Sequence, residues 1–375
     1  MKISIVLTAS AVSAHMVVPR DAPNMPASAF PKFEVITLDQ AKQGLDRDIQ
    51  NLPPKPVSNL TASVDTSVKS SLKISAAVSV KATTAASRAC AASPNYRFEW
   101  RNFSAGRRLS FVTACQCLLN RAPSGRFSQS RNRYEDFVAL HQNVMTQVHN
   151  NALFLIWHRY FLWTFEQVLR TECGYSRAMM WWDETLDAGN FANSDIFTNP
   201  NLFGNLPGLL NGNPQCISTG AFRGVTAHIG PGTTQTNHCL SRGVTETNTA
   251  QCNAAFINYC QARTAYPDFE TCLEYGPHGY GHNGIGGVMQ DVWSSPSDPI
   301  FWVHHAFIDH AFAAWQALDP SRTTTISGVD STGRALTLDY VISMGGIRPD
   351  VKIRDILDPM GGVNIGGTAF CYKYA

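Results

Sequence analysis

Six of the eleven histidines in this 375-residue chain fall into two groups inside apolar helical patterns. Such surroundings are costly for an unpaired polar side chain, so each imidazole there needs a partner. Neutral imidazole is also a common ligand of copper, zinc and iron. The sequence therefore offers two candidate metal sites; the plainer alternative for each histidine is a satisfied residue of the core. The two groups are His141, His149 and His158, and His278, His282 and His305.

One pair has the spacing of helix-borne metal ligands. The sequence PHGYGH places His278 and His282 four residues apart. On a helix this spacing brings both imidazoles to one side, within reach of a single ion.

A second helix should carry the third histidine of this group. Asp298 is a good N-cap residue, and Pro299 suits the first helical position. Apolar residues then recur at near-helical spacing, so one stripe is buried and His305 can point inward with it. The adjacent His304 lies about 100° away, so at most one of the two faces a given site. Taken alone, this stretch also fits a buried helix with one satisfied core histidine.

The first group cannot lie on one straight helix. His141 and His149 are eight residues apart, about 80° off a shared face, and His149 and His158 are on roughly opposite faces. The chain must therefore break between them, and Asn150 and Asn151 supply that break as cap residues. We expect His141 within one helix, His149 near its end, and His158 inside the next.

Several unrelated residue types fall at fixed spacings around these histidines. Residues 273–282 read LEYGPHGYGH, and residues 295–309 read SPSDPIFWVHHAFID. With the three histidines upstream, this combination resembles the type 3 copper family of tyrosinases and catechol oxidases, over residues 89–375. The short chain, the wide gap between the first two histidines and the YKY ending are most similar to short fungal tyrosinase-like polyphenol oxidases.

The resemblance implies a mainly α fold, a four-helix bundle holding a dinuclear copper site, with long disulfide-tied loops and little β structure. It implies oxidation of ortho-diphenols, and of some monophenols or ortho-aminophenols, to ortho-quinones, with O2 as co-substrate reduced to water. Each group of three histidines would hold one of two copper ions, which alternate between Cu(I) and Cu(II). Six neutral imidazoles without an inward carboxylate pair also favour copper over a di-iron site.

The resemblance also assigns roles to neighbouring residues. Glu274, one turn before His278, would accept a phenolic proton through a water molecule. The substrate ring would stack on His282. Gly279 stands where members that hydroxylate monophenols often carry Asn, which favours catechol oxidase over tyrosinase. The remaining expected site residues are His304, Asp309 and Phe301 behind the ligands, and Asn283, Val292 and Trp293 around the pocket.

One position departs from many family members. Where they carry a cysteine joined by a thioether to the second histidine, this chain has Met145. We therefore expect no such cross-link and expect His149 to be held by packing alone. His228 and His238 lie in loop-rich sequence and are interpreted as exposed.

Haemocyanins provide the alternative function, because they bind dioxygen at the same six-histidine copper pair without turnover. Such carriers shield the site, and no shield is evident in this sequence. The Tyr-x-Tyr near residue 374 marks the end of the catalytic domain in the family, so no carboxyl-terminal lid is expected. We therefore favour an oxidase.

Composition suggests three segments. Residues 1–14 resemble a short signal peptide, and residues 15–88 a propeptide or flexible tether outside the core, since residues 34–94 hold no aromatic side chain. Residues 89–375 form the catalytic domain. All ten cysteines lie there and are interpreted as disulfides.

A secreted glycoprotein is the expected setting, with glycosylation sequons at Asn59 and Asn102. Net charge is only +2 with 15% charged residues, so no basic stripe predicts a nucleic-acid or membrane partner. We expect a small phenol as the partner, and a monomer or weak dimer.

Overall fold

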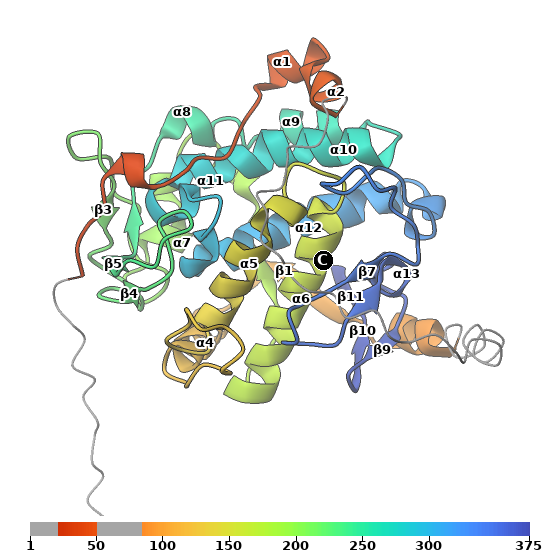
Figure 1. The fold of residues 1–375 in the computed structure, drawn as a ribbon, viewed down its shortest axis with the longest axis horizontal. Coiled ribbons are helices and arrows are strands. Elements are labelled where there is room, and N and C mark those ends of the chain that lie inside the picture. The colour runs from red at the N-terminus through yellow and green to blue at the C-terminus, as the bar shows by residue number, and fades with distance from the viewer. Residues whose placement is uncertain (1–21, 51–84) are drawn as a thin grey trace, which may run out of the picture.

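Four helices surround the two histidine groups at the centre of the molecule (Figure 1). The structure is a computed structural model that describes residues 22–50 and 85–375. The expected signal peptide and the sequon at Asn59 lie outside the described residues. The predicted mainly α fold with little β structure is confirmed. The four helices are α5 (Glu135–Val148), α6 (Phe154–Cys173), α11 (Gly279–Ile285) and α12 (Ile300–Ala317).

The chain breaks between α5 and α6 at the predicted place. His149 follows α5 in an extended conformation, and Asn150 has a φ of 59°. Asparagine tolerates this left-handed region better than most residues. The Asn151 side chain accepts a hydrogen bond from the Leu153 amide at 3.0 Å and starts the next helix. Because of this sharp turn, His149 lies beside the residues of α6.

The helix before α11 does not run straight into it. Between α10 (Tyr266–Leu273) and α11, residues Glu274–His278 form a π-helical turn that contains Pro277. Proline lacks the amide that the regular ladder requires, and π-turns often occur at functional sites. His278 therefore stands at the junction of two helical segments.

A small parallel sheet joins distant parts of the chain. Its central strand β1 (Asn95–Glu99) pairs with β11 (Tyr372–Tyr374) on one side and with β2 (Met180–Trp181) on the other. The remaining strands form two-stranded ladders. These are β3 (Gln215–Cys216) with β6 (Ser241–Arg242), β4 (Thr226–Ala227) with β5 (His238–Cys239), β7 (Val341–Ile342) with β8 (Val351–Lys352), and β9 (Val363–Ile365) with β10 (Thr368–Phe370).

Further helices surround the bundle. They are α1 (Leu38–Lys42), α2 (Leu45–Gln50), α4 (Ala105–Leu119), α7 (Asp195–Thr198), α8 (Glu246–Thr249), α9 (Ala254–Gln261) and α13 (Ile353–Ile356). Within the described ranges, the structure contains no helix with the length and apolar character needed to cross a membrane.

A buried carboxylate connects the sheet to the bundle. Asp309 of α12 accepts hydrogen bonds from Arg159 Nε at 2.6 Å and Arg97 Nη1 at 3.2 Å, and from the hydroxyls of Tyr372 and Tyr374, each at 2.7 Å. The two guanidinium groups hold the pKa of Asp309 below its ordinary value, although burial acts in the opposite direction. Asp309 was expected to orient a metal-binding imidazole, and that expectation is wrong. Its oxygens face α6 and the sheet instead of the histidines.

Eight of the ten cysteines form four disulfides. Cys115 and Cys252 are free and buried, so the interpretation of all ten as bridged is wrong for these two. Both thiols have a raised pKa because burial disfavours the thiolate. The bridges are Cys90–Cys371, Cys117–Cys173, Cys216–Cys239 and Cys260–Cys272.

Part of the segment interpreted as a propeptide or tether packs on the catalytic domain. Phe30, Ile36 and Ala41 are 2%, 4% and 0% exposed and belong to the hydrophobic core. In Figure 1 this segment crosses the molecule and leads into α1 and α2, which lie beside α9 and α10. The expectation that the whole of residues 15–88 lies outside the core is therefore wrong for this part.

Candidate metal centre

The first histidine group converges as its spacing predicted. His141 projects from α5, His149 follows the end of that helix, and His158 lies in the second turn of α6. All three are buried, and their ligand atoms lie within 4.8 Å of one another. His141 Nε2 and His149 Nε2 are 3.2 Å apart, while His158 Nε2 is buried with no hydrogen-bond partner.

The second group converges in the same way. His278 and His282 face His305 of α12, and His282 Nε2 lies 3.2 Å from His305 Nε2. His278 Nε2 is buried without a partner. The two groups are neighbours, because the rings of His158 and His305 stack with centroids 4.6 Å apart.

Five of these six imidazoles are oriented by a hydrogen bond at Nδ1. In the first group Nδ1 of His141 lies 2.9 Å from the Trp293 carbonyl, and Nδ1 of His158 lies 2.9 Å from the carbonyl of Phe154. His149 Nδ1 lies 2.9 Å from Glu274 Oε1. A proton on Nδ1 fixes the tautomer and leaves the Nε2 lone pair free for a metal.

In the second group, two histidines are hydrogen-bonded at Nδ1 to carbonyls nearby in the sequence, and the third has no such bond. His278 Nδ1 faces the carbonyl of Glu274 at 3.1 Å, and His282 Nδ1 faces the carbonyl of Met289 at 2.7 Å. His305 Nδ1 is buried with no partner. Its ring is stacked on Phe301 instead, with centroids 4.0 Å apart. Phe301 therefore lies against His305, and its expected role behind a metal ligand stays a prediction.

The histidines fit a pair of metal ions. Nitrogens bound tetrahedrally at about 2.0 Å lie about 3.3 Å apart, close to the 3.2 Å separation in each group. Burial lowers the pKa of His141 to about 4 and those of His149 and His278 well below 6.5. These imidazoles are thus neutral, the form that binds metals. The unpartnered Nε2 atoms of His158 and His278 are explained if metals are their partners.

His304 lies beside the second group and is held by a residue that the sequence analysis missed. Its Nδ1 is hydrogen-bonded to Glu184, which is buried and 120 residues away in the chain. Its ring centroid is 4.5 Å from that of His282. His304 also offers a ligand atom to the second group, but the 3.2 Å approach belongs to His305. The assignment of His305 as the ligand stays a prediction.

Glu274 contacts both groups. Its Oε1 lies 2.9 Å from His149 Nδ1 and accepts the Asn150 amide at 2.9 Å, while its carbonyl anchors His278. The expectation that packing alone holds His149 is therefore wrong. Proximity in sequence linked Glu274 to His278, but only the fold brings its carboxylate to His149.

An N-terminal segment covers the centre. The ring of Phe33 is stacked on His282, with centroids 4.1 Å apart and an interplanar angle of 22°. The side chain of Asn283 donates to the Phe33 carbonyl at 2.9 Å and accepts the Phe33 amide at 3.2 Å. The Val292 amide donates to the carbonyl of Pro31 at 3.0 Å. Two predicted pocket residues, Asn283 and Val292, thus hold this segment, and the expectation of an unshielded site is wrong.

Gly279 lies under the same segment. Its φ of −61° is ordinary for a helix, so the backbone does not require glycine. A Cβ at this position would lie 2.8 Å from Val35 Cγ1 and 3.2 Å from the Glu34 carbonyl. The close approach of the covering segment therefore accounts for the absence of a side chain.

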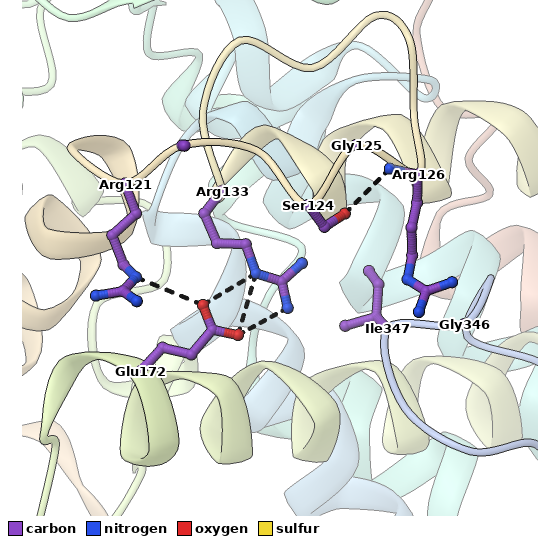
Figure 2. A pocket seen from close by; sticks show the side chains of 9 residues that line it. Arg121, Ser124, Gly125, Arg126, Arg133, Glu172, Gly346 and Ile347 are labelled. Carbon is purple, nitrogen blue, oxygen red and sulfur yellow. Dashed lines mark hydrogen bonds and ion pairs between the residues drawn. The ribbon is translucent and has the colours of Figure 1, made fainter.

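A cavity of about 220 Å³ opens beside this cover. Its lining includes Phe33, His149, Glu274 and Val292. A wider hollow of about 790 Å³ lies elsewhere, among Arg121, Arg126, Arg133 and Glu172 (Figure 2). The carboxylate of Glu172 binds Arg133 there, and the lining contains no histidine. The smaller cavity is the one that adjoins the metal centre.

The predicted rim residue Trp293 contributes through its backbone, since its carbonyl anchors His141.

Of the two loop histidines that were expected to be exposed, one is buried. His228 is partly exposed and hydrogen-bonded to Glu135, whereas His238 is fully buried against Phe30. The covering segment provides that burial.

The fold and the paired histidine groups define a type 3 copper protein, and comparison with known proteins agrees. The model of the common central domain of tyrosinase matches residues 131–318. Tyrosinase-like protein phomQ2 of Diaporthe leptostromiformis is 31% identical over 296 residues, covering 75% of this chain and 73% of the relative. Tyrosinase P of Aspergillus terreus is 28% identical over 337 residues, covering 75% and 92%. The chain belongs to the tyrosinase family, whose members bind two copper ions.

Comparison with solved structures also supports the tyrosinase fold. A point mutant of polyphenol oxidase from Thermothelomyces thermophila superposes with a TM-score of 0.68 at 25% identity, covering 80% of this chain and 95% of that one. Tyrosinase from Burkholderia thailandensis superposes with a TM-score of 0.52 at 16% identity, covering 76% and 74%.

Proposed function

We propose that this chain is a secreted dinuclear copper oxidase that converts ortho-diphenols to ortho-quinones and reduces O2 to water. The observation that carries the proposal is the pair of buried histidine groups, each with two Nε2 atoms 3.2 Å apart. Copper, when bound there, would supply the electron transfer from diphenols to dioxygen, in which two diphenols give two electrons each and one O2 is reduced to two molecules of water. His141, His149 and His158 would hold one ion, and His278, His282 and His305 the other.

The chain's own residues then bind and deprotonate the phenol. The ring of His282 offers a flat surface at the mouth of the centre, where an aromatic ring already lies in this structure. Glu274 borders the 220 Å³ cavity and is the carboxylate we assign to accept the phenolic proton, through a water molecule. The same carboxylate keeps the Nε2 of His149 pointed at its metal.

Catechol oxidation is favoured over the hydroxylation of monophenols. A phenol has a pKa near ~10, so a monophenol needs a well-placed base before it can bind a metal as phenolate. Gly279 offers no side chain to hold a water molecule beside Glu274. Ortho-aminophenols are a further substrate class within the proposal. Among the relatives, N-acetyl-6-hydroxytryptophan oxidase of Emericella nidulans, 27% identical over 359 residues, is named for another hydroxylated aromatic compound.

The haemocyanin alternative can no longer be set aside for lack of a shield. What favours the oxidase is that the curated relatives named above are tyrosinases or oxidases. Secretion is supported by four disulfides, which form and persist in oxidising compartments.

Oxygen uptake by the copper-loaded full chain tests the proposal. We expect uptake with catechols, slower uptake with ortho-aminophenols and weak or lagging uptake with simple monophenols. Reversible binding of dioxygen without consumption of any phenol would instead indicate a carrier. One copper per chain, or a preference for zinc, would contradict the dinuclear assignment.

A further inference from the structure

Asp291 is a buried carboxylate with no part in the proposed metal binding or proton transfer. It is 0% exposed and lies in the segment between α11 and α12. Its Oδ1 accepts the Trp293 amide at 3.0 Å, and its Oδ2 accepts the Ser294 hydroxyl and the Gly232 amide, each at 2.7 Å. Burial raises the pKa of Asp291, while these donors act in the opposite direction because they stabilise the ionised form. A buried charge is costly, so a carboxylate with this set of donors calls for an explanation.

Two of these bonds hold the peptide unit that carries the Trp293 carbonyl. The Trp293 amide precedes that carbonyl and the Ser294 side chain follows it, and both are bonded to Asp291. The carbonyl itself lies 2.9 Å from Nδ1 of His141. Asp291 thus fixes the orientation of the oxygen that sets the tautomer of a predicted metal ligand.

The third bond leads back to the helix of His141. The Gly232 amide donates to Asp291 at 2.7 Å, and the Gly232 carbonyl accepts a hydrogen bond from Nε2 of Gln142 at 2.8 Å. Gln142 directly follows His141 in α5. Helix α5, the loop of Gly232 and the segment of Asp291 therefore form a closed ring of hydrogen bonds that begins and ends at these two neighbouring residues.

A glycine allows the loop of Gly232 to approach this closely. Gly230 has a φ of 98°, and a Cβ there would lie 2.2 Å from Ser294 Oγ and 3.3 Å from Asp291 Oδ2. A side chain at this position would be strained at this φ and would collide with the Ser294 hydroxyl. The loop can therefore reach Asp291 only because residue 230 lacks a side chain.

We infer that Asp291 is a positioning residue for the metal of the first histidine group: it orients the Trp293 carbonyl toward His141 and so keeps Nε2 of His141 directed at the metal. The inference rests on the proposed function only in that this group binds copper. The second group should not depend on Asp291. Its anchors are the carbonyls of Glu274 and Met289, and neither residue is among the described partners of the Asp291 carboxylate.

The two copper sites can be tested one at a time in the full chain. His282→Ala should leave copper only in the first group and His141→Ala only in the second, and competition with a chelator gives the Kd of the copper that remains. Adding Asp291→Ala to His282→Ala should raise this Kd by about tenfold, at the lower end of the cost of losing support behind a ligand. Adding Asp291→Ala to His141→Ala should leave the Kd unchanged.

A conservative variant and a matched control separate positioning from packing. Asp291→Asn is isosteric and keeps an oxygen for the Trp293 amide, so it should raise the Kd of the first group less than Asp291→Ala does. Asp330→Asn is the control, because Asp330 is also buried and accepts the Thr332 amide and hydroxyl at 2.9 and 2.6 Å. It should leave both Kd values unchanged. The melting temperature of the metal-free chain is measured for each variant.

The outcomes distinguish this role from the proposed function. An unchanged Kd at the first group in the Asp291→Ala variant would overturn the inference. A similar rise at both groups, together with a lower melting temperature, would also overturn it, since Asp291 would then only stabilise the fold. If the Kd of the first group alone rises as expected but neither the wild type nor any variant oxidises a phenol, the inference stands and the proposed function fails.

Discussion

The two histidine groups hold the same number of imidazoles but differ in where their orientation comes from. His141 and His149 of the first group depend on Trp293 and Glu274, which lie in the half of the chain that carries the second group. His278 and His282 depend on carbonyls four and seven residues away. The second group is therefore largely self-contained, and the first is assembled against it.

This difference gives the carbonyl and the carboxylate of Glu274 separate tasks. The carbonyl is hydrogen-bonded to His278 Nδ1 and is still present after any substitution of the side chain. The carboxylate is hydrogen-bonded to His149 Nδ1 and is lost when the side chain is replaced. One residue thus couples the two groups, and side-chain changes there should affect them unequally.

The largest effect should follow loss of a metal ligand from either group. His141→Ala and His282→Ala should each reduce the copper content from two ions to one and lower catechol oxidation to background, because the reaction needs both metals. Metal analysis and oxygen uptake measure this. His228→Ala, at the partly exposed partner of Glu135, is the control and should keep both coppers. Retention of two coppers in either ligand variant would refute its assignment.

The second-largest effect should differ between the two histidine groups. Glu274→Gln should weaken copper binding at the first group by about 10- to 100-fold, the usual cost of losing a hydrogen-bond partner behind a ligand. The second group should keep its affinity. Chelator titration of the loaded protein measures both sites.

Glu270→Gln is the matched control for that variant. Burial and the adjacent Glu274 hold the pKa of Glu270 well above its ordinary value, so glutamine resembles its protonated form. Copper affinity should not change. Equal weakening of both sites by Glu274→Gln would contradict the division between carbonyl and carboxylate.

A smaller effect is expected behind the second group. Glu184→Gln and His304→Ala should keep both coppers and reduce kcat by about tenfold, at the lower end of the cost of such changes. His304 has no carbonyl anchor, so Glu184 alone orients its Nδ1 among the described contacts. Loss of a copper from His304→Ala, with both retained in His305→Ala, would exchange the roles of the two histidines.

The smallest effect should come from Phe301. His305 lacks an Nδ1 partner and is held by stacking on this ring. An aromatic contact contributes about 0.5–1.5 kcal/mol, so Phe301→Leu should speed the loss of copper from the second group by about 2- to 10-fold. Stopped-flow transfer of copper to a chelator measures this rate. An unchanged rate would show that backbone geometry alone holds His305.

Much of the metal centre could be predicted from the sequence because helical spacing and capping act between residues that are close in the chain. The spacing of His278 and His282, the cap residues Asn150 and Asn151, and the apolar stripes each determine structure within a few residues. Helical periodicity therefore predicted that His278 and His282 lie on one side of a helix and that the chain turns after His149, whereas the full set of six ligands came from the family resemblance.

The remaining contacts depend on topology, which a single sequence does not display. Glu184 reaches His304 across 120 residues, and Asp309 meets Arg97 across 212. The sequence also did not reveal that residues 30–36 cover the centre. This segment is held by hydrogen bonds to its backbone, which leave no trace in composition, and it falls within residues 15–88, which the composition assigns to a propeptide or tether.

The buried Asp309 cluster also implies an order of assembly. The carboxylate of α12 and the guanidinium groups of Arg97 and Arg159 are complete only when the hydroxyls of Tyr372 and Tyr374 arrive. Those tyrosines leave the ribosome well after α12, so a nascent chain that already contains all six histidines still has buried charges without their full set of partners. Domains fold as units during synthesis. The bundle should therefore close only after Tyr372 and Tyr374 have been synthesised, and we expect copper to bind after that point.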